Sequence, residues 1–263
     1  MFESSTENYT VGKGQAYFDR KDENGAYEGE RNIGNVVSLS TSVEMEKLDH
    51  YSTKRKYRLK DKSVVIEVNP KLSLTLDEIN AENFALLFLA DVQEVEQTAS
   101  TSDETMTIEA AKVKPGYVID LGKCFIDETT FGVSGAGGTD FASGTDYLLD
   151  ARCGKLQIYG NGSIDGSEDL EITYRLASAK YKKLSNFQRS NIEGRFTYVS
   201  ENAAGNNFII KFWSASFTPT GDTVLITDSA EWMNIQLEGE IQADENGHPE
   251  SPFGETIVIE KGQ

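Results

Sequence analysis

Alternation of apolar and polar residues over short segments is the feature that most constrains the fold of this 263-residue chain. In residues 71–76, for example, Leu72, Leu74 and Leu76 all fall on one side of an extended backbone. A period of two is typical of a β-strand that buries one face. We expect roughly a dozen strands, at residues 16–19, 30–34, 37–46, 63–68, 71–76, 105–109, 117–121, 155–159, 170–176, 195–199, 207–213, 233–241 and 256–260.

Turn signals join two pairs of these strands into hairpins. The Asn-Gly pair within residues 21–25 predicts a turn inside a hairpin that covers residues 14–34. The sequence Ala-Ala-Gly-Asn at residues 203–206 predicts a second hairpin between the strands on either side.

One segment has a different period. In residues 80–90, Phe84, Leu87 and Phe88 recur at helical spacing, and Asn80 is a suitable N-cap. We expect a helix here that packs its aromatic side on a sheet. The fold class predicted is therefore all-β with one flanking helix, as a β-sandwich or partial barrel.

The length leaves room for one large β domain or two small ones. The sequence contains no internal repeat and no clear linker. We expect a single domain over residues 1–263, with a loop-rich insertion at about residues 93–150. The insertion is predicted from its Thr, Ser and Glu content and from five glycines between residues 132 and 144.

The most distinctive charge feature is a basic segment in an acidic chain. Residues 47–62 contain seven of the 25 Lys and Arg residues, whereas the formal net charge of the chain is −18. The segment lies between two expected strands that could pair, so we interpret it as a long charged loop. Its natural partner is another copy of the same acidic chain. The net negative charge argues against binding of nucleic acid, which requires Lys and Arg at the phosphates.

Residues that could support catalysis or metal binding are few. His50 and His248 are the only histidines and stand in polar surroundings, while Cys124 and Cys153 form no CxxC motif. We expect no catalytic residue, no metal site, no cofactor and no enzymatic activity. With no export signal at the N-terminus, the cysteines are expected to be free, partly buried thiols. No apolar run approaches the ~20 residues that span a bilayer, so no membrane partner is expected.

The polar sides of the alternating strands are rich in carboxylates. Glu44 and Glu46 share one side of their strand, Glu67 lies on the return strand, and Glu238 and Glu240 alternate with apolar residues. Two interpretations stay open: a sheet face in ordinary solvent, or the wall of an acidic, water-filled channel.

Several stretches together resemble a known family. Residues 12–20, 29–35, 42–52, 63–69 and 79–89 resemble, in sequence and order, the N-terminal half of the major tail proteins of long-tailed, non-contractile bacteriophages. The likeness covers about residues 10–95. It implies a β-sandwich with a flanking helix, six of which form a ring. The inner sheets of a ring join into a continuous β-barrel, and stacked rings form the tail tube that conducts the genome into the host cell.

The resemblance also implies positions and partners. The loop that reaches the neighbouring ring maps to residues 47–62, with Lys47, His50, Tyr51, Lys54, Arg55, Lys56, Arg58, Lys60 and Lys62. Candidate lumen-facing residues are Glu44, Glu46, Glu67, Glu238 and Glu240. The implied partners are further copies of the chain and the tape-measure, tail-tip and tail-terminator proteins, with double-stranded DNA passing through unbound. The implied location is the virion tail, assembled in the host cytoplasm.

Two alternatives are kept. One is a tube subunit of a related contractile injection or secretion machine, against which the insertion weighs. The other is a carbohydrate- or cell-surface-binding β-sandwich, which would use exposed aromatic residues such as Tyr147, Tyr159, Trp213 and Trp232.

Overall fold

The computed structural model describes residues 9–259 and divides the chain into two compact units. The first combines Met1–Val92 with Leu184–Gln263, and the second is Gln93–Lys183. Both are built from β-strands, and the described residues contain a single α-helix, as expected for an all-β chain with one helix. The insertion expected at about 93–150 lies inside the second unit, which continues to Lys183 and has a core of its own.

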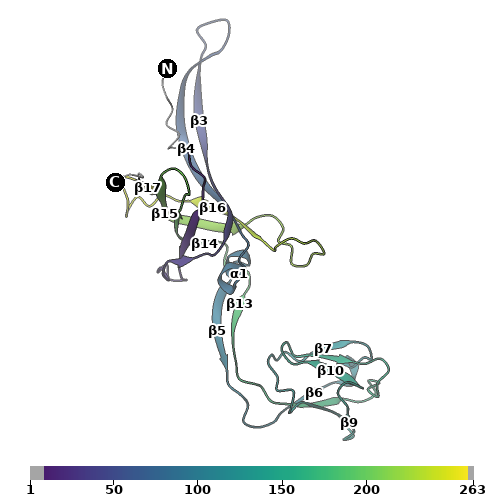
Figure 1. Cartoon of the computed structure of the whole chain (residues 1–263). Coiled ribbons are helices and arrows are strands. Elements are labelled where there is room, and N and C mark those ends of the chain that lie inside the picture. Colours follow the sequence, from purple (N-terminus) through teal and green to yellow (C-terminus); the bar gives the residue numbers. More distant parts are fainter. Residues whose placement is uncertain (1–8, 260–263) are drawn as a thin grey trace. The chain divides into compact units, whose positions relative to one another are not determined.

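The first unit is built on one antiparallel sheet (Figure 1). Its strands follow the order β2-β1-β14-β15-β16-β4-β3, with β17 paired to the first half of β15. The order ends in β2 and β3, and no pairing within residues 9–259 joins these two strands into a closed barrel. The strands are β1 (Gly14–Arg20), β2 (Arg31–Asn32), β3 (Val36–Ser52), β4 (Leu59–Leu76), β14 (Ile192–Ser200), β15 (Asn207–Pro219), β16 (Ile235–Ile241) and β17 (Gly254–Ile259).

Both predicted hairpins are present in this sheet. Strand β1 pairs with β2 across the Asn-Gly turn, and β14 pairs with β15 across residues 201–206. The alternation predicted for residues 71–76 is also confirmed, because Leu72, Leu74 and Leu76 are buried on one face. They pack in one cluster with Phe196, Phe217 and neighbouring apolar residues of β15 and β16.

The helix α1 (Ala81–Leu87) covers the apolar face of this sheet, and it begins as predicted. The side chain of Asn80 accepts a hydrogen bond from the Asn83 backbone N–H at 2.9 Å, which satisfies a donor that the first turn leaves unpaired. The predicted aromatic packing face is wrong. In this short helix Leu86 enters the core, whereas Phe84 and Phe88 are half-buried and stack on each other with centroids 5.7 Å apart.

The second unit contains two small sheets, of order β10-β11-β7 and β6-β12-β8-β9. Leu156 and Ile158 of the first and Leu170 and Ile172 of the second are almost completely buried in a shared core. Residues 126–150, which belong to the insertion expected to be loop-rich, contain three short strands. The strands are β6 (Glu104–Ile108), β7 (Val118–Asp120), β8 (Gly132–Gly135), β9 (Asp140–Phe141), β10 (Tyr147–Asp150), β11 (Lys155–Ile158) and β12 (Leu170–Tyr174), with a 3₁₀ turn at Ala110–Lys112.

A two-stranded ribbon of β5 (Asp91–Gln97) and β13 (Ala179–Ser185) lies where the chain passes between the units. Neither strand was predicted from the sequence. Both alternate polar residues with few apolar ones, and ion pairs such as Lys182 with Glu94, at 3.8 Å, join them across the ribbon.

The basic segment is mostly strand, and the long loop predicted for residues 47–62 is wrong. Strands β3 and β4 stay paired from Val36 opposite Leu76 to Ser52 opposite Leu59, with two bulges in their outer part, so only residues 53–58 connect them. The pairing continues because the outer residues interact across the strands: His50 contacts Asp61 at 2.5 Å and Lys60 contacts Asp49 at 2.7 Å.

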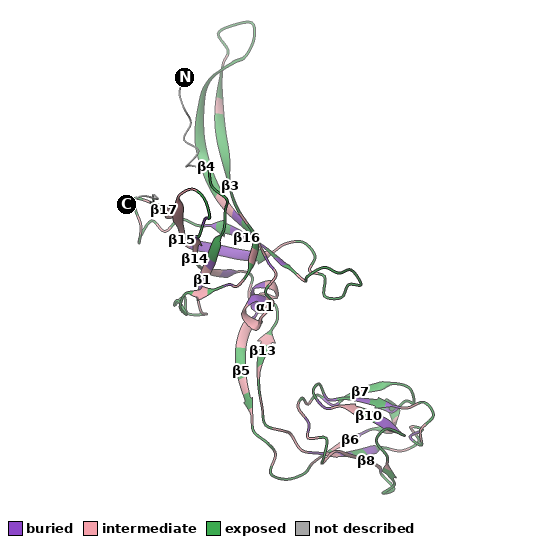
Figure 2. Cartoon of the chain, viewed as in Figure 1, coloured by how far each residue is buried: buried purple, intermediate pink, exposed green. Residues whose placement is uncertain are grey.

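We call residues 42–69 the arm. This part of the β3–β4 hairpin extends past the sheet, and almost all of its residues are exposed (Figure 2). From Ser42 to Ser52 a strand spans about 35 Å at ~3.3 Å per residue. The arm has no core of its own in the isolated chain.

Two separate cores make a local prediction possible. Replacement of Ile172, which is fully buried in the second unit, by Ala should lower the free energy of unfolding of that unit by about 2–5 kcal/mol. Val118→Ala, on an exposed side chain of the same unit, should change it by less than about 0.5 kcal/mol. Both changes can be measured by urea unfolding, with proteolysis of the second unit as the signal. Equal losses of unfolding free energy in the two variants would contradict this account of the core.

Candidate functional site

The structure brings the five predicted glutamates onto one face of the first unit's sheet. In the register, Glu46 lies opposite Glu67, and Glu44 lies opposite Asn69. On the other side of β4, Glu238 and Glu240 of β16 lie opposite Ser73 and Lys71. Because successive side chains of a strand alternate between faces, this set lies on the face opposite the buried Leu72 and Leu74. We call it the acidic face.

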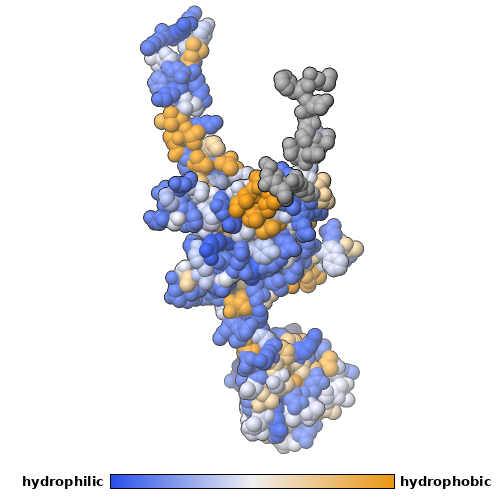
Figure 3. Space-filling model, turned by 60° about the vertical axis from the view of Figure 1, so that its left-hand side comes forward, coloured by the Kyte–Doolittle hydropathy of each residue, from blue (hydrophilic) through white to orange (hydrophobic). Residues whose placement is uncertain are grey.

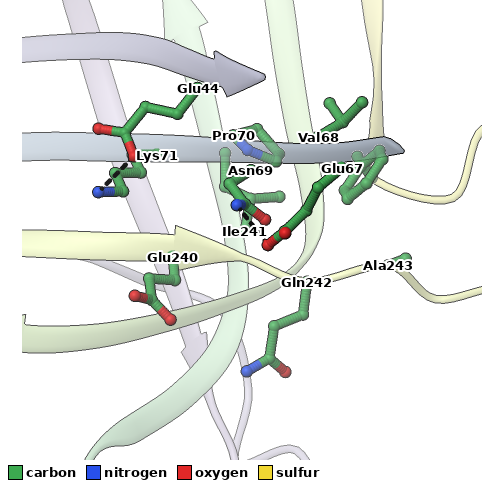
Figure 4. A pocket seen from close by; sticks show the side chains of 11 residues that line it. Glu44, Glu67, Val68, Asn69, Pro70, Lys71, Glu240, Ile241, Gln242 and Ala243 are labelled. Atoms are coloured by element: carbon green, nitrogen blue, oxygen red, sulfur yellow. Dashed lines mark hydrogen bonds and ion pairs between the residues drawn. The ribbon is translucent and has the colours of Figure 1, made fainter. Parts of the chain in front are cut away.

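A hollow of about 530 Å³ opens on the acidic face (Figure 4). Glu44, Glu67 and Glu240 line it from three strands, together with Asn69 and Lys71. The Lys71 ammonium lies 3.1 Å from a Glu44 carboxylate oxygen, and the Asn69 amide donates to Glu67 at 2.7 Å. Three carboxylates therefore share the hollow with one ammonium.

The pKa of Lys71 reflects the negative charge of these carboxylates. Its pKa is raised, first by the hydrogen bond and charge of Glu44 and then, against some desolvation, by the charges of Glu238 and Glu240. One ammonium does not balance the five glutamates, so the formal charge of the face is negative. A negative surface disfavours a polyanion such as DNA. Within residues 9–259 no group of three or more His, Cys, Asp or Glu residues is arranged to hold a metal ion.

The arm carries the opposite charge. Residues 47–62 contain seven bases and two acids, a local formal charge of +5, whereas the remaining residues contain 18 bases and 41 acids. The predicted contact residues are distributed as follows: Lys47, His50 and Tyr51 on β3, Lys60 and Lys62 on β4, and Lys54, Arg55, Lys56 and Arg58 in the connection.

Some of these side chains have interaction partners within the arm, and others do not. Besides the contact of His50 with Asp61 and the ion pair of Lys60 with Asp49, the Arg58 guanidinium lies 5.0 Å from the centre of the Tyr51 ring. The three successive bases at residues 54–56 form no ion pair with the part of the chain that the structure describes. They form a cationic tip.

Sequence reasoning missed an apolar surface on the arm. Val43 and Met45 of β3 lie opposite Pro70 and Val68 of β4, on the face that continues the core side of the sheet. Val43 and Met45 are 54% and 53% exposed. Figure 3 shows apolar colour along the arm below a hydrophilic tip. Further exposed apolar residues on the arm are Leu48, Val64, Val65 and Ile66.

The alternating apolar residues of 43–45 and the run at 64–66 were the available signal, and only strands were predicted from them. Leu48 and its partner Val64 fall on the other side of the hairpin from Val43 and Met45. Exposed apolar surface is typical of an interaction site. We call these residues, together with Val68, the apolar base of the arm.

The other candidate residues do not assemble into a site. Tyr147 is buried in the second unit, and Tyr159 is half-buried there. In the first unit Trp213 is half-buried and stacks on His248 with ring centroids 3.8 Å apart, whereas Trp232 is 87% exposed. The expectation of partly buried cysteines is wrong, because Cys124 and Cys153 are both exposed.

Comparison with known proteins adds one result. A family model described as "Protein of unknown function UCP028589" matches residues 9–257. The chain belongs to the UCP028589 family. The match covers both compact units, so the inserted second unit is part of the UCP028589 pattern. No curated protein matches the chain. Among the described residues, no helix is both long enough and apolar enough to cross a membrane.

The acidic face gives a prediction about Lys71. Glu44→Gln should lower the pKa of Lys71, because it removes the carboxylate that raises this pKa most. Glu46→Gln is the matched control, since Glu46 is not among the groups that act on Lys71. NMR titration of the lysine side chains measures both, and an unchanged Lys71 pKa in Glu44→Gln would show that the contact is absent in solution.

The sign of the pH dependence follows from the raised pKa. The stabilising contribution of Lys71 is complete below the pKa of the unfolded chain and is lost as the pH rises through the higher folded-state pKa.

Proposed function

We propose that this protein is the structural subunit of a tube, built from stacked hexameric rings, that conducts a bacteriophage genome through the virion tail into the host cell. The observation that carries the proposal is the arm: a long exposed hairpin with an apolar base and a cationic tip on an otherwise acidic chain. The resemblance of residues 10–95 to tail tube proteins supports the same function.

The apolar base supplies the attraction between subunits. Covering a half-exposed Val, Ile or Met side chain contributes roughly 1 kcal/mol. Each exposed ion pair contributes only ~0–1 kcal/mol. In our proposal the apolar base therefore provides most of the affinity, and the cationic tip orients the arm towards acidic surface of the next ring. Repetition around a ring multiplies these modest contributions.

The outer edge of β3 supplies the second contact. Strand β3 stands at one end of the sheet order and β2 at the other. An edge strand exposes backbone N–H and C=O groups that another strand can pair with. We propose that neighbouring subunits pair at these edges, so that six sheets form one ring-shaped β-barrel around a lumen.

The acidic face then lines the lumen. Each phosphate contact would hold the genome and would have to be broken for it to move. Glu44, Glu46, Glu67, Glu238 and Glu240 repel phosphate, and Lys71 is occupied by Glu44. Double-stranded DNA would pass without specific binding.

The resemblance extends the proposal to tape-measure, tail-tip and tail-terminator proteins as partners, and to assembly in the host cytoplasm. A tube subunit of a contractile injection or secretion machine would use the same arm and the same edges, and the particle itself distinguishes the two. A carbohydrate-binding module is less well supported, since Tyr147 is buried, Trp213 is packed against His248, and of the four candidate aromatic residues only Trp232 is exposed.

Electron microscopy of the purified full chain at rising concentration tests the proposal. We expect rings and tubes of constant diameter with an open lumen. Reversal of the tip charges, by Lys54→Glu, Arg55→Glu and Lys56→Glu together, should abolish stacking and leave the circular dichroism spectrum unchanged. A matched control reverses three exposed bases outside the arm, Lys13, Lys114 and Lys183. Monomers under all conditions would overturn the tube, and normal tubes from the tip variant would overturn the role of the arm.

The acidic face has a test of its own. Glu238→Gln with Glu240→Gln should leave the tubes intact, because neither residue lies on the arm, and should slow DNA ejection from particles that contain the variant. The measurement is the rate of DNA release and the infectivity per particle. Release at the normal rate would exclude a lumenal role for this pair.

A further inference from the structure

The two cysteines of the chain lie on neighbouring segments of the second unit. Cys124 follows β7, and Cys153 lies between β10 and β11. The segments are joined by backbone hydrogen bonds. The Phe125 N–H donates to the Arg152 carbonyl at 3.2 Å, and the next residues along, Ile126 and Ala151, are joined at 2.9 Å.

These contacts bring the two cysteines close together. Cys124 precedes the donor Phe125 and Cys153 follows the acceptor Arg152, so this hydrogen bond joins the peptide groups next to both cysteines. A disulfide requires Cα atoms ~4.4–6.8 Å apart, which backbone contact on both sides of the two residues allows. On the far side the segments stay close: a Cβ on Gly154 would lie 1.8 Å from the Lys123 carbonyl oxygen.

A second observation places both thiols around one charge. The Lys155 ammonium lies 2.6 Å from an Asp120 carboxylate oxygen. The pKa of Lys155 is raised, first by this hydrogen bond, and it is raised further by both Cys153 and Cys124. Both sulfur atoms are thus within electrostatic reach of a single side chain. Both cysteines are exposed, so a reagent in solution can reach them.

We propose that Cys124 and Cys153 form a reversible disulfide that closes when the protein meets an oxidising environment. With a low-molecular-weight disulfide such as glutathione disulfide as oxidant, one thiolate attacks a sulfur of the reagent. A mixed disulfide forms and one glutathione thiolate leaves. The second thiolate then attacks the protein sulfur of the mixed disulfide and releases the second glutathione. Two protein thiols lose two protons and two electrons, and glutathione disulfide becomes two glutathione molecules.

The bond would tie the end of β7 to the turn before β11 and would enclose β8, β9 and β10 in one covalent loop. A cross-link of this kind stabilises by restricting the unfolded chain. In a reducing compartment the thiols stay free, and outside it the second unit becomes more stable. This inference goes beyond the tube proposal and does not depend on it, because all of its residues lie within the second unit.

The test equilibrates the reduced full chain with glutathione disulfide and measures thiols, intact mass and melting. We expect the two accessible thiols to disappear, the mass to fall by two hydrogen atoms, and proteolysis to yield a peptide that joins Cys124 to Cys153. The melting temperature of the second unit should rise by on the order of 10 °C and return on reduction.

Serine variants provide the controls. Cys124→Ser and Cys153→Ser should each retain one thiol, accept glutathione as a mixed disulfide and show no such rise. The double variant should melt at one temperature under both redox conditions. The proposal is overturned if the native chain carries two glutathiones without the internal bond, forms only cross-linked dimers, keeps both thiols free, or closes the bond without a change in melting.

Discussion

The antiparallel pairing of β3 with β4 is the interaction on which the rest of the first unit depends. It begins inside the sheet, where β4 also pairs with β16, and it continues along the arm. Because the register is continuous from Ser38 opposite Thr75 to Glu46 opposite Glu67, one alternation of side chains fixes two surfaces at once. Leu72 and Leu74 enter the core on one side, and the glutamates gather on the other. A shift of one residue would exchange the two sets.

The pairing also separates charge along the molecule. The acidic face belongs to the inner part of the hairpin and to β16, whereas the bases concentrate at the outer end. An even mixture of the same residues would leave a single subunit with little directional preference. In the tube that we propose, this separation gives each subunit a positive end and a negative face, so that copies would attract in some orientations and repel in others. Apolar surface at the base of the arm would then determine the affinity of a correctly oriented pair.

The sequence predicted those parts of the fold that follow from one-sided burial. Leu72, Leu74 and Leu76 alternate cleanly and are core, and Asn80 caps its helix because the local pattern suffices. The β5–β13 ribbon was not predictable in this way, since it buries few apolar side chains. The outer arm was taken for a loop because its bulges interrupt the alternation and lysines replace apolar residues.

The candidate sites, too, were predictable only where the pattern within a single strand was sufficient. Alternation along each strand predicted that Glu44 shares a face with Glu46, and Glu238 with Glu240. That all of them lie on one face of the sheet could not be predicted, because it depends on which strands are neighbours. The same limit applies to Cys124 and Cys153. They are far apart in sequence, and only the turn between β10 and β11 brings them together. The helix shows a third case, in which a short element buried Leu86 although aromatic spacing favoured Phe84.

The junction of β4 with β16 has a mechanical consequence. A pull on the arm along its axis would load the β4–β16 hydrogen bonds, from Leu76 opposite Ile235 to Lys71 opposite Glu240, parallel to the strands. Ladder bonds lie perpendicular to the strands, so such a force shears all of them together and cannot open them one at a time. The arm is therefore anchored where an axial force meets its greatest resistance, and a sideways force would peel it away far more easily.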